Sequence, residues 1–388
     1  MKYPLASNSW DQDELDAISS VIRSGMYTMG SKVKLFEEQF AVEMGVKHAV
    51  MVNSGSSANL LMLTALSLKE NLRCGDYNII VPAVGWATTY FPVHQSGARL
   101  NFVDINLSTL NIELNQIPEA INKDTKAILA VNLLGNPAEL ETLKKIADKE
   151  GLILLEDNCE SFGATVDGKF AGTYGTMGTY SFFFSHHLQT MEGGMIVTDD
   201  DDLNDHLRSL RAHGWIRDLP DDNRWYQKTG DSFKEPFIFA LPGYSVRPLE
   251  MSGAIGLVQL LKWKKNIAQR QANAKAFKEL FDPESWCLIQ SVMPNAESSW
   301  YGFSLMIRDR DPLVKGLMRS GVELRPVMTG NFLKQPVMKY FNNPIIPKDG
   351  CPFADMVDDH GFFIGNHPHD VKNDLKQVHS LIVKLRGL

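Results

Sequence analysis

Residues 48–68 read HAVMVNSGSSANLLMLTALSL, the pattern of a short apolar strand, a turn rich in Ser and Gly, and an apolar helix. Further apolar runs of strand length follow along the chain, separated by helical stretches such as residues 138–151. Strands that are apolar along almost their whole length are typical of a parallel sheet buried on both faces. The sequence therefore predicts an α/β fold with a mostly parallel sheet, whose further strands we expect at residues 78–83, 99–105, 127–135, 152–157, 179–184 and 194–199.

The last third of the chain begins with a long helical stretch. Residues 247–281 are long enough to bridge two domains, and shorter strands and helices follow them. A chain of 388 residues can form a large domain and a smaller one, each with its own core. We therefore expect a large α/β domain over residues 1–250, followed at 251–388 by the bridging helix and a small C-terminal α+β domain.

Charge and composition disfavour several classes of protein. The formal net charge of −7 argues against nucleic acid or an anionic membrane as the main partner. The first ten residues, MKYPLASNSW, have no apolar signal segment, and no apolar run approaches the roughly 18 residues of a membrane-spanning helix. The sequence predicts a cytoplasmic protein without a metal site, because no zinc, disulfide or iron–sulfur spacing relates its four cysteines, Cys74, Cys159, Cys287 and Cys351.

Two strand ends carry candidate ligand-binding groups. The turn at residues 53–58 precedes a helix, whose N-terminal N–H groups favour a phosphate, and the hydroxyls of Ser56 and Ser57 would add donors. The same residues also fit an ordinary helix N-cap. Asp157 ends a buried strand, where ligands bind in α/β sheets. A buried carboxylate needs a cationic partner such as a protonated pyridine nitrogen, although an Asp that caps the next loop is about equally consistent.

An aromatic side chain and a pair of histidines are further candidates. Trp86 follows another strand end and could stack on a planar ring, although packing is the commoner role of Trp. Residues 181–194 read SFFFSHHLQTMEGG and contain His186 and His187. A lone histidine is usually structural or solvated, but two in succession before a Gly pair are less easily explained by packing. Because histidine exchanges protons near neutral pH, this segment is a candidate general acid/base.

Basic side chains beyond residue 210 could bind an anion. Residues 210–220, LRAHGWIRDLP, place His213 and Arg217 in an Asp-rich loop, where they either pair at the surface or bind a diphosphate. Residues 241–256, LPGYSVRPLEMSGAIG, lead into the long helix with Arg247 near its start, which is a second reasonable anion site.

The order of these features resembles the sugar aminotransferases and dehydratases that depend on pyridoxal 5′-phosphate (PLP). These are enzymes of fold type I, the aspartate aminotransferase fold, and the resemblance runs over almost the full length of the chain. It implies a large domain with a mostly parallel seven-stranded sheet and a smaller C-terminal domain. It also implies a homodimer, because in this fold a neighbouring subunit completes the active site.

In that family a Ser-Phe pair, a cofactor-binding lysine and a Glu-Gly-Gly stretch occur at regular spacing. The lysine lies five residues after the Ser and six before the Glu. Counted from Ser181 and Glu192, the lysine position is 186, which is His186 in this chain. No lysine occurs between Lys169 and Lys228 that could replace it.

The resemblance assigns roles to the candidate residues. His186 would be the catalytic acid/base, and Asp157 would pair with the pyridine nitrogen of the cofactor. Ser245 stands where the family usually has an Asn that reaches the phosphate site of the partner subunit, and its side chain is shorter. The remaining cofactor contacts would come from Ser56, Ser57 and Ser181 at the phosphate, Trp86 on the ring and Glu160 beside the ring hydroxyl, and substrate contacts from His213, Arg217, Arg247 and Arg325.

Histidine at the lysine position implies a dehydratase. The cofactor would be held non-covalently and could persist as the amine form, pyridoxamine phosphate (PMP). By the same resemblance, the reaction would remove the C3 hydroxyl of GDP-4-keto-6-deoxymannose and use L-glutamate to restore PMP. One alternative is an aminotransferase that makes an amino sugar, disfavoured by His186; another is a CDP-sugar 3-dehydrase, which needs an iron–sulfur cluster and is disfavoured by the scattered cysteines. A non-enzymatic homologue would not need the retained base and phosphate turn.

Overall fold

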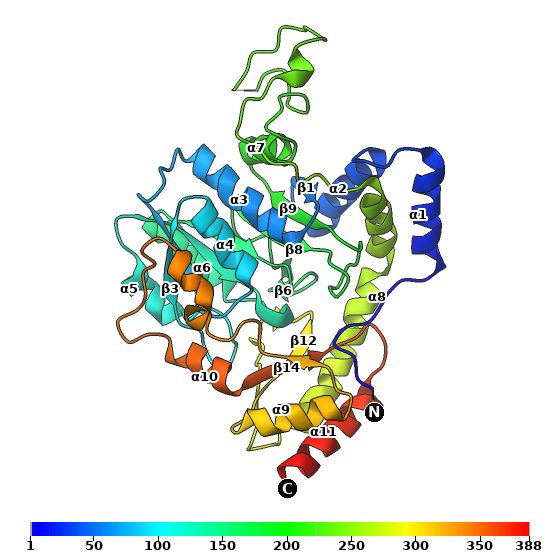
Figure 1. The fold of residues 1–388 in the computed structure, drawn as a ribbon, viewed down its shortest axis with the longest axis vertical. Helices are drawn as coiled ribbons and strands as arrows, with labels where there is room; N and C mark the ends of the chain where they lie inside the picture. Colours follow the sequence, from blue (N-terminus) through cyan, green and yellow to red (C-terminus); the bar gives the residue numbers. More distant parts are fainter. Residues whose placement is uncertain (1, 224, 388) are drawn as a thin grey trace.

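The computed structural model describes residues 2–223 and 225–387 and is built around a seven-stranded sheet (Figure 1). The strands are β1 (His48–Val52), β2 (Asn78–Pro82), β3 (Arg99–Val103), β4 (Thr125–Val131), β5 (Ile153–Asp157), β8 (Met177–Ser181) and β9 (Gly194–Thr198). They are ordered β1-β9-β8-β5-β4-β2-β3, and β9 is antiparallel to both of its neighbours. All other neighbours are parallel, which confirms the predicted α/β fold with a mostly parallel sheet.

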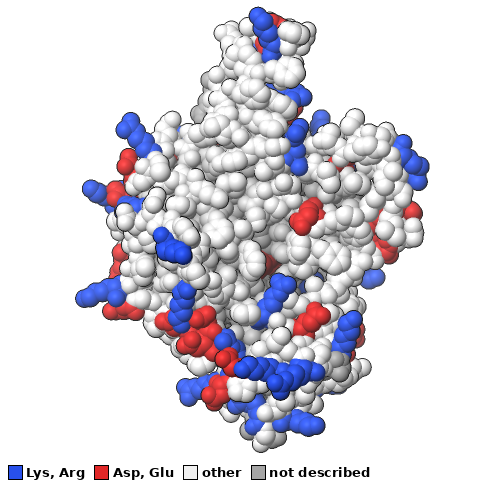
Figure 2. Space-filling view, in the orientation of Figure 1, with Lys and Arg blue, Asp and Glu red and all other residues white. Residues whose placement is uncertain are grey.

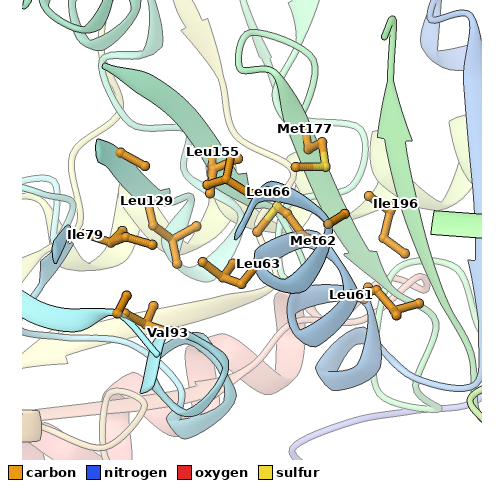
Figure 3. Packing of buried hydrophobic residues seen from close by; sticks show 14 of the residues in the cluster. Leu61, Met62, Leu63, Leu66, Ile79, Val93, Leu129, Leu155, Met177 and Ile196 are labelled. Atoms are coloured by element: carbon orange, nitrogen blue, oxygen red, sulfur yellow. The ribbon is translucent and has the colours of Figure 1, made fainter. Parts of the chain in front are cut away.

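Helix α3 (Gly55–Lys69) lies across one face of this sheet and is apolar over most of its surface. Figure 3 shows Leu61, Met62 and Leu66 among the strand residues Leu155 and Met177. Full burial of one such side chain contributes about 1.5–3 kcal/mol, so this packing holds the first turn of α3 at the carboxyl edge of the sheet. The same face carries the neighbouring helices α4 (Ala87–Gln95) and α7 (Asp201–Arg211).

Alternate strand residues face the opposite layer, as expected for strands buried on both sides. Val50 and Ile196 belong to the core under α3, whereas Met51 and Met195 pack against a second core. That second layer contains α2 (Ser31–Met44), α5 (Ile117–Ala120), α6 (Leu140–Glu150), the short 3-10 helix η1 (Leu114–Gln116) and the first half of α8 (Glu250–Phe281), on which α1 (Gln12–Ser24) packs. The 3-10 helix η2 (Leu133–Gly135), which follows β4, packs in a separate core with Val327 and Phe363.

A second, antiparallel sheet is formed by the last third of the chain. Its order is β10-β12-β14-β13, and the end of α8 packs on it through Phe277, which stacks on Phe303 with ring centroids 4.4 Å apart. The elements of this part are β10 (Leu288–Ile289), β12 (Gly302–Met306), α9 (Arg310–Arg319), β13 (Leu324–Arg325), η4 (Phe332–Lys334), η5 (Pro336–Tyr340), α10 (Pro352–His360), β14 (Gly361–Gly365) and α11 (Lys372–Arg386).

A small three-stranded sheet joins the two parts of the chain. It consists of β6 (Thr165–Val166), β7 (Lys169–Phe170) and β11 (Ala296–Glu297), in the order β11-β6-β7. The division into domains of residues 1–250 and 251–388 stays a prediction. No helix in the described ranges is long and apolar enough to cross a membrane.

The chain between α7 and α8 projects from the body as an arm, drawn in green at the top of Figure 1. Among its described residues, regular structure is limited to the short 3-10 helix η3 (Glu235–Phe237) and isolated bridges such as Ala212 to Ser245. Phe233, Phe237 and Phe239 of this arm are exposed. The arm therefore presents aromatic surface that the described part of this chain does not cover.

Candidate active site

A cavity of about 290 Å³ lies between the large sheet and the antiparallel sheet. The ends of β4, β5 and β8 contribute Val131, Asp157 and Ser181 to its wall, and the antiparallel sheet contributes Phe363. Ligands of α/β proteins bind at this edge because the strands end there and the following loops diverge. Seven of the residues predicted for the site line this cavity: Ser56, Trp86, Asp157, Glu160, Ser181, His186 and Arg325.

One end of the cavity is formed by the first turn of α3. Ser54 caps the helix, since its Oγ accepts a hydrogen bond from the Ser57 N–H at 3.1 Å. Ser56 Oγ donates to Thr88 Oγ1 at 3.0 Å. Gly55 permits a close approach, because a Cβ there would lie 2.6 Å from Cβ of Ser181. Free N–H groups, hydroxyls and the positive end of the helix dipole together suit a phosphate group.

Asp157 is a buried carboxylate in the cavity wall, 5% exposed. Its Oδ2 accepts hydrogen bonds from Asn59 Nδ2 at 2.8 Å and Thr89 Oγ1 at 2.7 Å. Its Oδ1 accepts one from the Cys159 N–H at 3.3 Å. Within residues 2–223 and 225–387, no lysine or arginine forms an ion pair with it. Since a buried carboxylate is stabilised by positive charge, this site suits a cationic ligand group.

Trp86 and Glu160 form further parts of the wall. Trp86 stands immediately before α4 and is 50% exposed, so its ring is available to a planar ligand. Glu160 accepts a hydrogen bond from the Leu134 N–H at 2.9 Å. Burial raises the pKa of Glu160 to about 8, with a further contribution from the negative charge of Asp157. Glu160 is therefore mostly protonated at neutral pH and able to donate a hydrogen bond.

His186 lies in the loop that follows β8 and lines the cavity. Its backbone N–H donates to the Phe183 carbonyl at 2.9 Å, and its ring Nδ1 lies 3.3 Å from Ser185 Oγ. Burial lowers the pKa of His186 to about 3, with a contribution from Arg270. The imidazole is therefore neutral at physiological pH and able to accept a proton.

The neighbouring His187 is oriented differently. It is buried away from the cavity, and its Nε2 lies 3.1 Å from the Ser299 carbonyl. Burial also lowers the pKa of His187 well below its usual value. Of the two histidines, only His186 reaches the cavity, as the spacing from Ser181 predicts.

The described residues that line the cavity include no lysine. A helix turn suited to a phosphate, a carboxylate that pairs with no lysine or arginine of the described ranges, and a neutral histidine converge in one cavity. Residues 8–383 match the DegT/DnrJ/EryC1/StrS aminotransferase family. The chain belongs to this family. The fold is that of the fold type I PLP enzymes, so the resemblance seen in the sequence is confirmed.

Within the DegT/DnrJ/EryC1/StrS family, the chain is similar to several dehydratases. It is 50% identical over 393 residues to GDP-4-keto-6-deoxy-D-mannose 3-dehydratase of Yersinia pseudotuberculosis, an alignment that covers 99% of both chains. It is 47% identical to E. coli GDP-4-keto-6-deoxy-D-mannose-3-dehydratase with bound hydrated PLP, with a TM-score of 0.94 over 98% of this chain and 99% of that one. Another structure of such a dehydratase, with a trapped PLP-glutamate geminal diamine, matches at 48% identity and a TM-score of 0.94, over 98% of this chain and 100% of that one.

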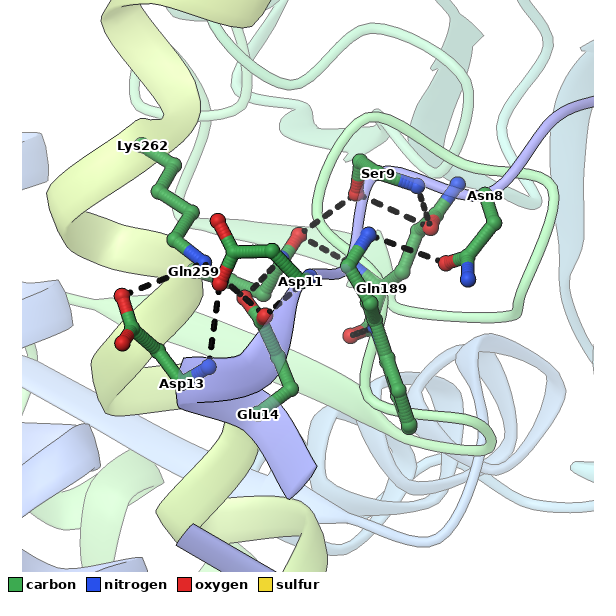
Figure 4. A network of polar contacts seen from close by, with 9 residues as sticks. Asn8, Ser9, Asp11, Asp13, Glu14, Gln189, Gln259 and Lys262 are labelled. Atoms are coloured by element: carbon green, nitrogen blue, oxygen red, sulfur yellow. Dashed lines mark hydrogen bonds and ion pairs between the residues drawn. The ribbon is translucent and has the colours of Figure 1, made fainter. Parts of the chain in front are cut away.

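A buried hydrogen-bond network positions the loop that carries His186. Figure 4 shows Gln189 in one network with Ser9 of the N-terminal segment and Gln259 of α8. Its Oε1 accepts hydrogen bonds from Ser9, and its backbone N–H donates to Gln259 Oε1 at 3.2 Å. Gln259 Nε2 in turn donates to the buried carboxylate of Glu14 at 2.7 Å, which Lys262 neutralises. Three segments far apart in the sequence therefore determine where this loop of the aminotransferase fold lies.

Five predicted site residues do not line the cavity. Ser57 turns its hydroxyl toward the helix cap, where it accepts a hydrogen bond from Ser54 Oγ at 3.1 Å. Ser245 is exposed at the base of the arm. The other three surround the ring of Trp215. The guanidinium carbons of Arg217 and Arg247 lie 3.7 Å and 5.6 Å from its centroid. The ring centroid of His213 lies 4.6 Å from it. The roles given to these five residues stay predictions.

Sequence reasoning missed several residues of the cavity wall. Asn59 and Thr89 donate hydrogen bonds to Asp157. They lie three residues after Ser56 and Trp86, so helix periodicity could have identified them as residues of the same face. Ser185 and Tyr301 meet beside His186. Tyr301 comes from the antiparallel part of the chain and carries no local sequence signal.

Proposed function

We propose that this chain is a GDP-4-keto-6-deoxy-D-mannose 3-dehydratase that uses PLP and PMP. It would remove the C3 hydroxyl to give GDP-4-keto-3,6-dideoxymannose, and L-glutamate would restore PMP with release of 2-oxoglutarate and ammonia. The observation that carries the proposal is His186, a neutral histidine at the lysine position, in the same cavity as Asp157. The similarity to dehydratases of this specificity supports the choice of GDP and mannose.

The residues of the cavity fit PLP. Asp157 would pair with the protonated pyridine nitrogen, Trp86 would stack on the ring, and the first turn of α3 with Ser56 would hold the phosphate. Glu160, protonated at neutral pH, would lie beside the ring hydroxyl. Ser181 would be a further phosphate contact. When bound, the cofactor supplies an electron sink for the bonds that break on the sugar.

His186 would move the proton that the dehydration requires. Its neutral Nε2 can accept a proton, because Nδ1 is engaged with Ser185 and Nε2 has no hydrogen-bond partner within the described ranges. It would then give the proton to the C3 hydroxyl, which leaves as water when the C3–O bond breaks. A lysine at this position would instead be a nucleophile toward the carbonyl carbon.

Two other activities of the family fit less well. An aminotransferase needs the cofactor-binding lysine, and no described residue of the cavity wall supplies one. A CDP-sugar 3-dehydrase needs ligands for an iron–sulfur cluster. The four cysteines are free, and no group of three or more potential metal ligands occurs in the described part of the chain.

The product of the reaction tests the proposal. We expect purified protein with PLP, L-glutamate and GDP-4-keto-6-deoxymannose to yield a nucleotide sugar one oxygen atom lighter than the substrate. Ammonia and 2-oxoglutarate should form in equal amounts. Mass spectrometry of the product distinguishes the alternatives, since an aminotransferase would leave C3 hydroxylated and add nitrogen at C4. That aminated product would overturn the proposal.

We also infer that the enzyme is a homodimer in which Ser245 of one subunit reaches the phosphate site of the other. Ser245 lies at the base of the arm, outside the cavity of its own chain, and the arm exposes Phe233 and Phe237. Figure 2 shows few charged side chains in the middle of the face below the arm, which suits a protein interface.

The free cysteines favour a cytoplasmic location.

Light scattering tests this assembly. We expect a molar mass near twice the 43.5 kDa of the chain. Replacement of Phe233 and Phe237 by Ser should weaken the dimer and lower the activity together, because the arm of each subunit would complete the site of the other. A fully active monomer would contradict the inference.

A further inference from the structure

The loop of His186 meets a hydroxyl pair that the proposed mechanism does not use. We propose that Tyr301, acting through Ser185, positions the imidazole of His186 so that Nε2 is the nitrogen that exchanges protons. This inference rests on the proposed function, since it assigns a positioning role for the same reaction.

The geometry forms a continuous chain of three polar groups. Ser185 Oγ lies 3.3 Å from His186 Nδ1 and 3.0 Å from the Tyr301 hydroxyl. The rings of His186 and Tyr301 also meet edge to face, with centroids 5.1 Å apart. All three side chains line the cavity. Tyr301 therefore contacts the imidazole directly through its ring and is linked to it a second time through the Ser185 hydroxyl.

Tyr301 is itself held from two sides. Its N–H donates to the Leu134 carbonyl at 3.0 Å, and its carbonyl accepts a hydrogen bond from Arg270 Nη1 at 3.3 Å. Leu134 belongs to the loop after β4, and Arg270 belongs to α8. A residue anchored to the large sheet and to the bridging helix can hold a loop residue in one orientation, as a positioning residue must.

The proposal requires one direction of the hydrogen bonds along this chain. If Nδ1–H donates to Ser185 Oγ and the Ser185 hydroxyl donates to Tyr301, Nε2 keeps its lone pair and is the base. The same chain stabilises the imidazolium that forms when Nε2 accepts a proton. Burial raises the pKa of Tyr301 to about 12, so its hydroxyl stays protonated and does not compete as a base.

Other titratable groups also surround this chain. The charges of Glu160, Arg325 and Arg270 influence the pKa of Tyr301. Arg270 also lowers the pKa of His186, and His187 lies beside His186. None of these side chains has a hydrogen bond to His186 Nδ1 or to the Tyr301 hydroxyl within the described ranges. The Ser185 hydroxyl is therefore the hydrogen-bonded link between Tyr301 and His186 through which the proposed positioning acts.

Tyr301→Phe tests the proposal, because it removes the hydroxyl and keeps the ring. We expect kcat to fall by about tenfold to a hundredfold, because Ser185, which meets the imidazolium, loses its own hydrogen-bond partner, with little change in KM. Ser185→Ala should have a similar effect, and the double variant should lose little more than either single variant. Tyr180→Phe is the matched control, because its buried hydroxyl donates to the Ala171 carbonyl at 3.0 Å outside the cavity.

A second measurement does not depend on turnover. Diethyl pyrocarbonate reacts with neutral imidazole, and peptide mass analysis separates His186 from the other histidines. In the cofactor-free protein, Tyr301→Phe should slow the modification of His186, because Nε2 would no longer be held as the ring nitrogen with the free lone pair. The modification of His48, which lies outside the cavity, should be unchanged. A wild type that fails to deoxygenate the sugar would contradict the proposed function, whereas this chemical test would still judge the role of Tyr301.

Three results would overturn the positioning role. The first is an unchanged kcat and an unchanged modification rate in Tyr301→Phe. The second is a loss of kcat in the His186→Asn background as large as in the wild type, since Tyr301 would then act without His186. The third is a similar loss of kcat in Tyr180→Phe, since the effect would then be one of general stability.

Discussion

His186→Asn is expected to lower kcat by about 10²–10⁴, the usual contribution of a general acid/base, while cofactor binding is retained. Asn keeps a polar group in the cavity but cannot exchange a proton. The residues that fit the cofactor, such as Asp157 and Ser56, are left unchanged. Steady-state kinetics with GDP-4-keto-6-deoxymannose gives the loss of turnover, and titration with PLP followed by absorbance gives the cofactor affinity.

His187→Asn is the matched control. His187 is buried away from the cavity, so the same change should affect turnover far less than at position 186. Its cost should appear in thermal stability, because the hydrogen bond to the Ser299 carbonyl is lost. An inactive His187 variant beside an active His186 variant would show that the assignment is wrong by one residue.

His186→Lys adds a qualitative test at the same position. The lysine should bind PLP covalently, and borohydride should then reduce the link to a stable modified peptide that mass spectrometry locates. Dehydration should be suppressed, because lysine replaces the neutral base. The wild type should give no such peptide, and a reduced cofactor–lysine peptide from the wild type would contradict the proposed chemistry.

Glu37→Ala is expected to lower the free energy of unfolding by about 3–5 kcal/mol, because it leaves a buried arginine without its counter-charge. Glu37 accepts hydrogen bonds from Arg208 at 3.2 Å, from Arg211 and from the Met51 N–H at 2.8 Å. Arg211 is 3% exposed and has no other ion pair within residues 2–223 and 225–387. Urea denaturation of the cofactor-free protein measures the change.

The next residue in the chain provides the control for this prediction. Glu38 is exposed and lies 4.0 Å from Lys34 on the same helix face, an arrangement that contributes little to stability. Glu38→Ala should therefore unfold at the same urea concentration as the wild type, within error. Equal stability of the two alanine variants would contradict the prediction, since the loss of the counter-charge of Arg211 would then have no measurable cost.

Much of the fold could be predicted because its strands are buried on both faces. Such strands are apolar along their length, so each one is visible in the sequence without knowledge of its neighbours. Helix α3 and the turn before it follow from the same run of residues 48–68. The antiparallel direction of β9 was not visible, because an apolar strand reads the same in either direction.

Part of the site could be predicted for a related reason. Asp157 and Ser56 stand at strand ends, and the carboxyl ends of parallel strands meet at one edge of a sheet. His186 followed from the spacing between Ser181 and Glu192. The residues around Trp215 show the limit of this reasoning, because His213, Arg217 and Arg247 gather together but outside the cavity of their own chain.

The sequence by itself determined the class of fold, the strand, turn and helix of residues 48–68, and the place of His186 in the spacing from Ser181 to Glu192. All three are properties of short segments, whose local spacing is enough to define them. Only the tertiary structure decided that Tyr301 meets His186 through Ser185, and that His213, Arg217 and Arg247 lie outside the cavity of their own chain. The physical reason is that these contacts depend on how α8 and the antiparallel sheet pack on the large sheet, where buried area and hydrogen bonds between distant segments determine the geometry.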